Sequence, residues 1–200
     1  MDCRMKDGIL YYEPTSSRLR VMRNGCSIIR REKIPKPTVL VDTREKDPLP
    51  LRANHPNWIK AERRVTLKTG DYSIEGMESF LALERKSLAD LVACTVTYRQ
   101  RFLASCARLS GFVWKAILVE ATFEDVKGGI ARYIPSDVHP NSICGTLDAI
   151  EAKYGIPVIY ASTVRDLATE RAASWLSKHF TYWWLEQHGH GRVLIDADGL

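Results

Sequence analysis

Apolar and polar residues follow two regular patterns between residues 38 and 186. Short apolar runs bounded by turn residues predict strands at residues 38–41, 63–67, 72–74, 80–84, 116–120 and 158–160. Apolar residues at helical spacing predict helices at 87–96, 98–109, 141–154 and 164–186. Strands followed by alternating helices indicate an α/β fold, with helices on the faces of a central sheet.

The first 37 residues predict a small β extension. Strands are expected at 9–13 and 18–22, and Asn24-Gly25 predicts a hairpin into a strand at 27–30. The segment Ile-Pro-Lys-Pro at 34–37 ends this region, because proline interrupts regular structure. The chain is therefore expected to contain a β extension at 1–37, a main domain at 38–187 and a C-terminal tail at 188–200.

The positive charge of the chain is concentrated in this extension. The formal net charge is +5, and residues 1–37 hold nine Lys or Arg and four Asp or Glu. Residues 38–200 hold 20 of each sign, so the whole excess lies at the N-terminus. A basic segment suits a polyanion such as DNA. Two compatible interpretations stay open: a strand pair added to the edge of the main domain, or a basic arm that contacts DNA.

Other features of the composition favour an intracellular, cytoplasmic protein. No apolar run approaches the roughly 18 residues of a membrane span, and the first residues lack the apolar core of a signal peptide. The cysteines are odd in number, scattered and without C-x-x-C spacing, so we expect free thiols rather than a zinc site. They are Cys3, Cys26, Cys94, Cys106 and Cys144. The pair His188-Gly-His190 is interpreted as part of the tail rather than as a metal site.

Three consecutive charged residues, Glu84, Arg85 and Lys86, follow an apolar strand. Successive side chains of a strand point to opposite faces, so Glu84 and Lys86 share one face and Arg85 lies on the other. Buried charges are costly without partners. One explanation is a salt bridge. The other is a metal site, in which Glu84 binds the ion and Lys86 holds or deprotonates a water.

Residues 68–76 favour the metal site. Gly70 and Gly76 bracket a strand that can return as a hairpin, which would bring Asp71 near Glu84. Two adjacent carboxylates repel each other unless a cation lies between them, and Mg²⁺ prefers such oxygen ligands. The spacing D-x12-E-x-K therefore predicts a magnesium site, although this motif alone is common by chance.

Three motifs occur in order along the chain: Val-Asp-Thr-Arg-Glu at 41–45, Gly-Asp-Tyr at 70–72 and Glu-Arg-Lys-Ser-Leu-Ala-Asp at 84–90. Together they resemble the XPF-type structure-specific nuclease family, over residues 38 to about 186. The resemblance implies a restriction-endonuclease-like fold with a mixed central sheet flanked by helices. It also implies an endonuclease that uses Mg²⁺, with Mn²⁺ as a substitute, on branched or flap-type DNA in repair or recombination.

The same resemblance assigns metal ligands. Asp71 and Glu84 would bind the ion, with the main-chain carbonyl of Arg85 as a third protein ligand. Asp42 would complete the acidic cluster, with a second metal ion as one option.

The resemblance also gives roles to the remaining motif residues. Lys86 would position the attacking water; proton abstraction is less favourable, since nearby carboxylates raise the pKa of a lysine. Arg44 would bind the scissile phosphate or brace the carboxylates, and Asp90 with Arg85 would orient the site from behind. Ser87 to Asp90 also has the form of a helix capping box, so Asp90 has two open interpretations.

Further expectations concern DNA and partner chains. Arg99 and Arg101 are two residues apart on a helix and cannot share one face, so at least one is expected to face the site and contact phosphate; an ordinary solvated helix face is the alternative. The aromatic cluster at 180–186 is expected to pack in the core, with a homodimer seam for part of it as the alternative. The resemblance itself implies a homodimer. The helix-hairpin-helix motifs of most family members are missing, so targeting would depend on the N-terminal segment, a dimer or a separate DNA-targeting subunit.

Two alternative functions remain open. One is a catalytically idle DNA-binding or dimerisation module of the same fold; the occupied motif positions argue against it. The other is a nuclease of broad specificity from a phage or mobile element.

Overall fold

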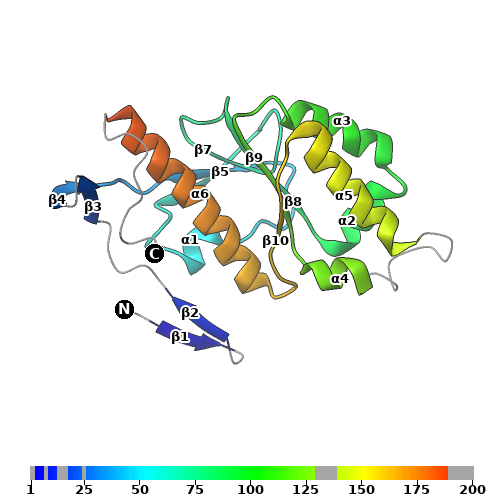
Figure 1. The fold of residues 1–200 in the computed structure, drawn as a ribbon, viewed down its shortest axis with the longest axis horizontal. Helices are drawn as coiled ribbons and strands as arrows, with labels where there is room; N and C mark the ends of the chain where they lie inside the picture. Colours follow the sequence, from blue (N-terminus) through cyan, green and yellow to red (C-terminus); the bar gives the residue numbers. More distant parts are fainter. Residues whose placement is uncertain (1–2, 7–8, 13–17, 24–25, 129–138, 189–200) are drawn as a thin grey trace.

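The computed structural model describes residues 3–6, 9–12, 18–23, 26–128 and 139–188. Its centre is a six-stranded sheet with the order β10-β9-β8-β7-β5-β6 (Figure 1). The strands are β5 (Thr38–Asp42), β6 (Ala61–Val65), β7 (Tyr72–Ile74), β8 (Leu81–Lys86), β9 (Trp114–Val119) and β10 (Val158–Tyr160). Strand β7 is antiparallel to both neighbours and the other adjacent pairs are parallel, so the sheet is mixed.

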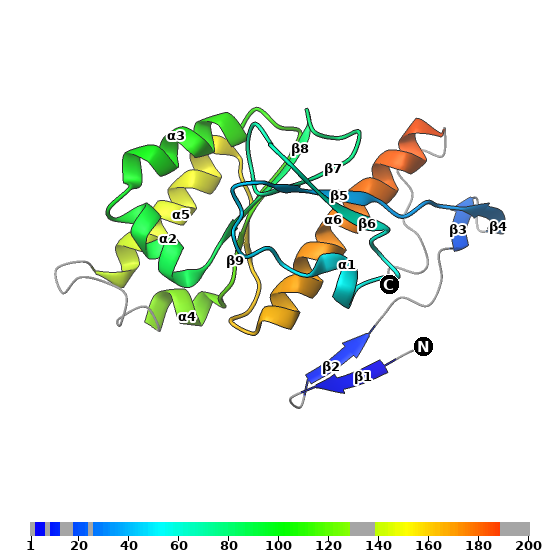
Figure 2. The ribbon, with the colours of Figure 1, turned by 180° about the vertical axis from the view of Figure 1, so that it is seen from behind.

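Helices flank this sheet, as the sequence pattern predicts. They are α1 (Leu51–Asn54), α2 (Leu88–Thr95), α3 (Arg99–Leu109), α4 (Phe123–Gly128), α5 (Pro140–Tyr154) and α6 (Arg165–Gln187). Helices α2, α3 and α5 lie together, away from α6 (Figures 1 and 2). The pattern did not predict α1 and α4, because helices of four and six residues are too short to show a helical period.

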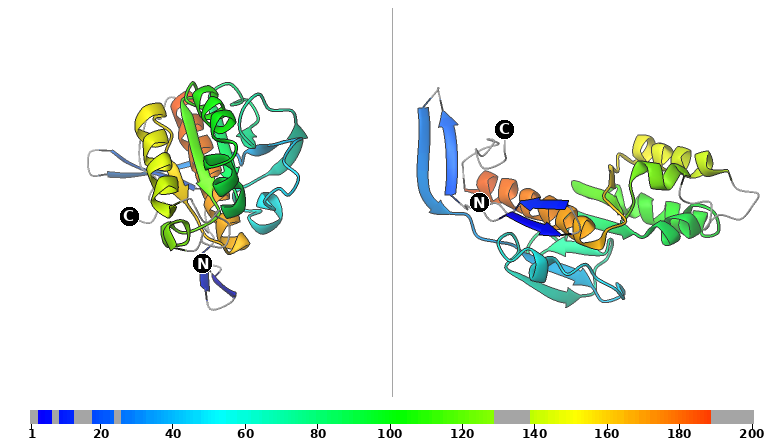
Figure 3. Two further views of the ribbon diagram at one scale, coloured as in Figure 1. Left: turned by 90° about the vertical axis from the view of Figure 1, so that its right-hand side faces the viewer. Right: turned by 90° about the horizontal axis from the view of Figure 1, so that it is seen from below.

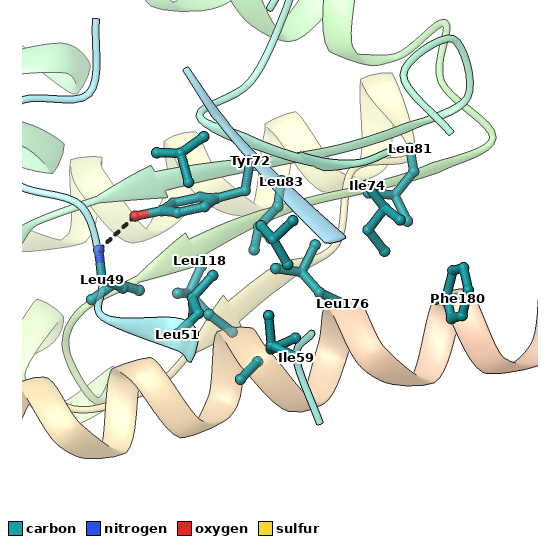
Figure 4. Packing of buried hydrophobic residues seen from close by; sticks show 14 of the residues in the cluster. Leu49, Leu51, Ile59, Tyr72, Ile74, Leu81, Leu83, Leu118, Leu176 and Phe180 are labelled. Carbon is teal, nitrogen blue, oxygen red and sulfur yellow. Dashed lines mark hydrogen bonds between the residues drawn. The ribbon is translucent and has the colours of Figure 1, made fainter. Parts of the chain in front are cut away.

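Side chains of β8 and β9 alternate between two apolar cores. Leu81, Leu83 and Leu118 pack with residues of α6 and α1 in one core, part of which is shown in Figure 4. Ala82 and Ile117 pack in the other core, with residues of α2, α3 and α5. The strand therefore directs alternate residues to opposite faces along its whole length.

Strand β8 is longer than predicted. It continues through its charged residues to Lys86, which pairs with Val119 of β9, whereas the apolar pattern ends at Leu83. Continued alternation directs Glu84 and Lys86 to the side of α2 and α3, and Arg85 to the side of α6. The predicted division of the three charges between two faces is confirmed by their contacts, described below.

The N-terminal strands form two separate antiparallel pairs: β1 (Cys3–Lys6) with β2 (Ile9–Tyr12), and β3 (Arg18–Arg23) with β4 (Cys26–Lys33). The predicted β3–β4 hairpin is present, although its turn residues Asn24 and Gly25 lie outside the described residues. Neither pair joins the six-stranded sheet (Figure 3). The choice between an added edge of the main domain and a DNA-contacting arm stays a prediction. Strand β1 was not predicted.

Three further expectations can be compared with the structure. Cys94, Cys106 and Cys144 are free thiols. Phe180 is buried in the α6 core, and Trp183 and Trp184 pack against it, which confirms core packing for these rings of the aromatic cluster. The expectation for His190 lies outside the described residues. Within the described ranges, every helix is too short or too polar to span a membrane.

Candidate active site

A cavity of about 300 Å³ opens between the end of β8, the turn before β7 and helix α3. The turn and β8 contribute Lys68, Thr69, Gly70, Asp71, Glu84 and Lys86. Helices α2 and α3 contribute Cys94, Tyr98, Arg101, Phe102, Ser105 and Arg108, and Arg44 completes the wall. The sequence thus brings Asp71, Glu84 and Lys86 into one cavity, as predicted.

The main chain fixes Asp71 beside β8. Its N–H donates to the carbonyl of Leu83 at 2.9 Å, and its carboxylate accepts from the N–H of Arg85 at 2.7 Å. Gly70 precedes it with a φ of +81°, and a Cβ there would lie 3.1 Å from the Cβ of Ala82 and 3.2 Å from the carbonyl oxygen of Leu83. A glycine is therefore required both for the turn and for this close approach.

Burial and a neighbouring carboxylate make Asp71 hard to ionise. The pKa of Asp71 is raised to about 7. Burial is the largest cause, and repulsion from Glu84 is the second. Attraction to Lys86 and the hydrogen bond from Arg85 oppose the rise. This is the situation of two carboxylates that share a site without enough positive charge between them.

Lys86 supplies part of that positive charge. Its Nζ lies 2.5 Å from Oε1 of Glu84 and 3.2 Å from the carbonyl oxygen of Arg85. Burial works against the charged form of Lys86, but Glu84 and Asp71 outweigh it and raise its pKa. Lys86 is therefore a cation at neutral pH, which fits the predicted positioning of a water better than proton abstraction.

Asp42 does not line the cavity, although its main-chain N–H donates to the carbonyl of Asp71 at 2.8 Å, and its place in the acidic cluster stays a prediction. It is buried, and its carboxylate accepts hydrogen bonds from the Nε, Nη2 and main-chain N–H of Arg44 and from the N–H of Leu67, at 2.7–3.0 Å. Burial favours protonation of Asp42, but these hydrogen bonds outweigh it and lower the pKa. Asp42 thus braces Arg44, whose side chain is 67% exposed and lines the cavity.

The remaining oxygen atoms fit a magnesium ion. Across the described residues, no three Asp, Glu, His or Cys side chains meet in a way that could hold a metal alone. Asp71, Glu84 and the Arg85 carbonyl form a set of two carboxylates and one carbonyl, which with waters matches the hard oxygen ligands that Mg²⁺ prefers. The ammonium group of Lys86 now contacts two of these oxygens, and it would have to move aside for the ion.

Arg85 lies on the opposite face of β8, within an ion network. Its guanidinium donates to Glu120 at the end of β9, to Glu45 at 3.2 Å and to the carbonyl of Asp47 at 2.9 Å. Arg165 of α6 donates to both carboxylate oxygens of Asp47 at 2.8 Å. The network holds β8, β9 and α6 to the loop after β5, which agrees with the predicted orienting role of Arg85. No local pattern of the sequence pointed to Glu120, which is 35 residues from Arg85 along the chain.

Asp90 forms the capping box. Its N–H donates to Oγ of Ser87 at 3.1 Å, and that hydroxyl donates back to the Asp90 carboxylate at 2.8 Å. Asp90 is exposed and does not line the cavity. The capping interpretation is therefore confirmed, and an orienting role in the site stays a prediction.

The two arginines at the start of α3 point in different directions. Arg101 lines the cavity, whereas Arg99 donates to Oγ1 of Thr146 on α5 at 2.6 Å. Only Arg101 therefore meets the expectation that one of the pair faces the site.

Arg108 and Lys68 also line the cavity, and the sequence analysis did not identify them. The spacing of Arg101, Ser105 and Arg108 would have revealed Arg108, because residues four and seven apart share a helix face.

Comparisons with known proteins define the class. Residues 23–170 match the ERCC4 domain, and this match covers more than half of the chain. The chain therefore belongs to the ERCC4 domain family. No curated protein matches the chain.

Two solved structures have folds similar to that of this chain. XPF from Aeropyrum pernix is similar with a TM-score of 0.56 and 19% identity, over 76% of this chain and 70% of that chain. The same protein in complex with DNA is similar with a TM-score of 0.53 and 20% identity, over 72% of this chain and 64% of that chain. The resemblance to the XPF-type family and the restriction-endonuclease-like fold are thus confirmed.

Proposed function

We propose that this protein is a Mg²⁺-dependent DNA endonuclease that hydrolyses phosphodiester bonds in branched or flap-type DNA, in repair or recombination. The observation that carries the proposal is the cavity in which Asp71 and Glu84 lie beside Lys86. Membership of the ERCC4 domain family supports it, and DNA as the partner is supported by the similar fold of XPF from Aeropyrum pernix in complex with DNA.

Each residue has a role that its geometry supports. Asp71, Glu84 and the Arg85 carbonyl would hold Mg²⁺, which when bound lowers the pKa of a water and neutralises charge on the phosphate. Lys86, a cation with its pKa raised, would orient that water by donating a hydrogen bond to it. A positioned cation of this kind also stabilises the negative charge that develops during hydrolysis.

Arg44 would bind the scissile phosphate. Asp42 fixes its guanidinium from one side through two hydrogen bonds, and the exposed remainder faces the cavity. A guanidinium held by a carboxylate loses less conformational freedom when it binds a phosphate, so the pair is preorganised. Asp42 acts through Arg44 in this scheme rather than as a metal ligand.

Cleavage mapping tests the proposal. End-labelled flap, fork, junction and plain duplex DNAs would be incubated with Mg²⁺, with Mn²⁺ and with EDTA. We expect cuts in a branched substrate with either metal and none with EDTA. Binding without any cleavage would overturn the proposal and favour the idle module, and equal cutting of plain duplex would favour a nuclease of broad specificity.

We also propose that the protein acts as a homodimer, because half-buried aromatic residues of α6 border a cavity of about 340 Å³ lined by Trp114, His179 and Tyr182. Sedimentation at micromolar concentration, with and without DNA, is expected to show two chains. A monomer under both conditions would remove this part of the proposal and leave DNA targeting to the N-terminal segment or to a separate subunit.

A further inference from the structure

Five cations line the active-site cavity, and the scheme above uses only two of them, Arg44 and Lys86. Arg44 is bound to Asp42 and Lys86 to Glu84. Lys68, Arg101 and Arg108 also line the cavity, and their side chains make no hydrogen bond or ion pair with another described residue. Cations gathered in a concave surface without partners indicate an anionic ligand.

Helix α3 arranges two of these cations in a row. Arg101 and Arg108 lie on the same face, with Ser105 between them, and all three line the cavity. Seven residues of α-helix correspond to about 10.5 Å along the axis. Two arginines at this separation can contact two phosphates of one DNA strand. Phe102 of the same helix is buried in the core, so the row is held on a rigid element.

An aromatic ring extends this row at the start of the helix. Tyr98 lines the cavity, yet 58% of it is exposed, and it makes no ring contact with other described residues. Tyr98 also occupies the N-cap position without a side-chain capping bond, where Ser, Thr, Asp or Asn would stabilise the helix. An exposed ring beside a track of cations is the arrangement with which proteins hold single strands, because phosphates follow the cations and bases stack on the ring.

We propose that Tyr98, Arg101 and Arg108 form a subsite for an unpaired stretch of the substrate strand, in which Tyr98 stacks on an unpaired base. Within a continuous duplex both faces of each base are already stacked, so the ring of Tyr98 can engage only an unpaired or terminal base. The subsite would therefore favour branched DNA over plain duplex. The inference rests on the proposed function, in that it takes DNA as the ligand of the cavity.

Binding in EDTA tests the inference without any cleavage. Fluorescence anisotropy would compare the parent protein with Tyr98→Ala and Tyr98→Phe on flap DNA and on plain duplex. We expect Tyr98→Ala to weaken flap binding about tenfold, and Tyr98→Phe to bind as the parent does, because the ring and not the hydroxyl stacks. Binding to plain duplex should change much less, because only its terminal bases have a free face. Phe123→Ala is the matched control, because Phe123 is also exposed, at 46%, but does not line the cavity.

An abasic scan of the flap locates the stacked base. At one position, loss of the base should weaken binding of the parent and leave that of Tyr98→Ala unchanged. Equal flap binding by Tyr98→Ala and the parent would overturn the inference, as would an equal loss on plain duplex. Arg101→Gln and Arg108→Gln should each reduce the slope of log affinity against log salt by about one. Arg63→Gln, a surface arginine paired with Glu75 outside the cavity, should leave the slope unchanged.

Failure of this inference and failure of the proposed function are distinguishable. Tyr98-dependent flap binding by a protein that never cuts DNA would overturn the nuclease proposal and support the subsite. Metal-dependent cutting with flap binding that ignores Tyr98 would support the nuclease and overturn the subsite.

Discussion

Glu120→Ala should destabilise the protein, because it leaves the buried charge of Arg85 without one of its partners. The side chains of Arg85 and Glu120 are 10% and 13% exposed. Removal of Glu120 would leave the guanidinium of Arg85 largely out of water and short of one partner. A buried charge without its partner is far more costly than an exposed one.

The structure sets the size of the effect. Breaking a buried ion pair by removing one partner costs about 3–5 kcal/mol. Arg85 would keep Glu45 at 3.2 Å and the Asp47 carbonyl at 2.9 Å. We therefore expect Glu120→Ala to lower the free energy of unfolding by about 2–3 kcal/mol. Glu120→Gln should cost less, because its amide oxygen still accepts a hydrogen bond.

Urea unfolding measures this difference against a matched control. Arg63 and Glu75 form a pair on the surface at 2.8 Å, with side chains 55% and 47% exposed. Glu75→Ala should cost less than about 1 kcal/mol. Equal losses of unfolding free energy in Glu75→Ala and Glu120→Ala would refute the reasoning. Burial would then not decide how much stability is lost when one partner of an ion pair is removed.

Three other predictions concern the turn, the pH dependence and the N-terminal segment. Gly70→Ala should destabilise the protein by about 1–3 kcal/mol more than Gly76→Ala in urea, because both glycines have positive φ but only at Gly70 would a Cβ crowd the neighbouring strand. Equal losses would contradict this. The folded protein retains a proton on Asp71 between the ordinary pKa of 3.8 and about 7, so stability should fall as pH rises through this window. Melting temperatures measured across pH should show this fall for the parent and not for Asp71→Asn. The same pH profile for both proteins would rule out the raised pKa of Asp71. Mg²⁺ competes with the same proton, so it should raise the melting temperature of the parent more at pH 8 than at pH 6. Deletion of residues 1–33 should lower the affinity for DNA and reduce the slope of log affinity against log salt. If neither changes, the segment is not a DNA-contacting arm.

Local patterns in the sequence were sufficient to predict the centre of the site. The distance along the chain from Asp71 to Glu84 is short enough for one hairpin, and strand alternation then separates Lys86 from Arg85. Both features are local, so the sequence alone predicts that Asp71, Glu84 and Lys86 meet. The same is true of the capping box at Asp90.

The rest of the site depends on contacts between distant residues. Asp42 was expected in the acidic cluster, but the N–H of Leu67, 25 residues away, helps to fix its carboxylate against Arg44. Glu120 meets Arg85 across 35 residues, and Arg165 meets Asp47 across 118. No local period carries such information, because it arises only when β8, β9 and α6 pack together.

The central claim is that Glu84 and Lys86 at the end of β8, with Asp71 beside them, form the catalytic edge of a nuclease. Cleavage, DNA affinity and melting temperature, measured on the same preparations of the parent, Asp71→Asn and Lys86→Ala, test it most directly. Asp71→Asn removes a charge that the metal needs and relieves repulsion with Glu84, so its melting temperature should hold or rise. Lys86→Ala removes the cation that orients the water.

We predict that both variants fold and bind branched DNA about as well as the parent, while Mg²⁺-dependent cleavage falls by roughly two or more orders of magnitude. A purely structural salt bridge between Lys86 and Glu84 predicts instead that Lys86→Ala keeps any cleavage that the parent shows. Lys86→Ala should lose some stability under either account, because this pair is about as buried as Arg85 and Glu120. Robust cleavage by either variant would contradict the catalytic assignment.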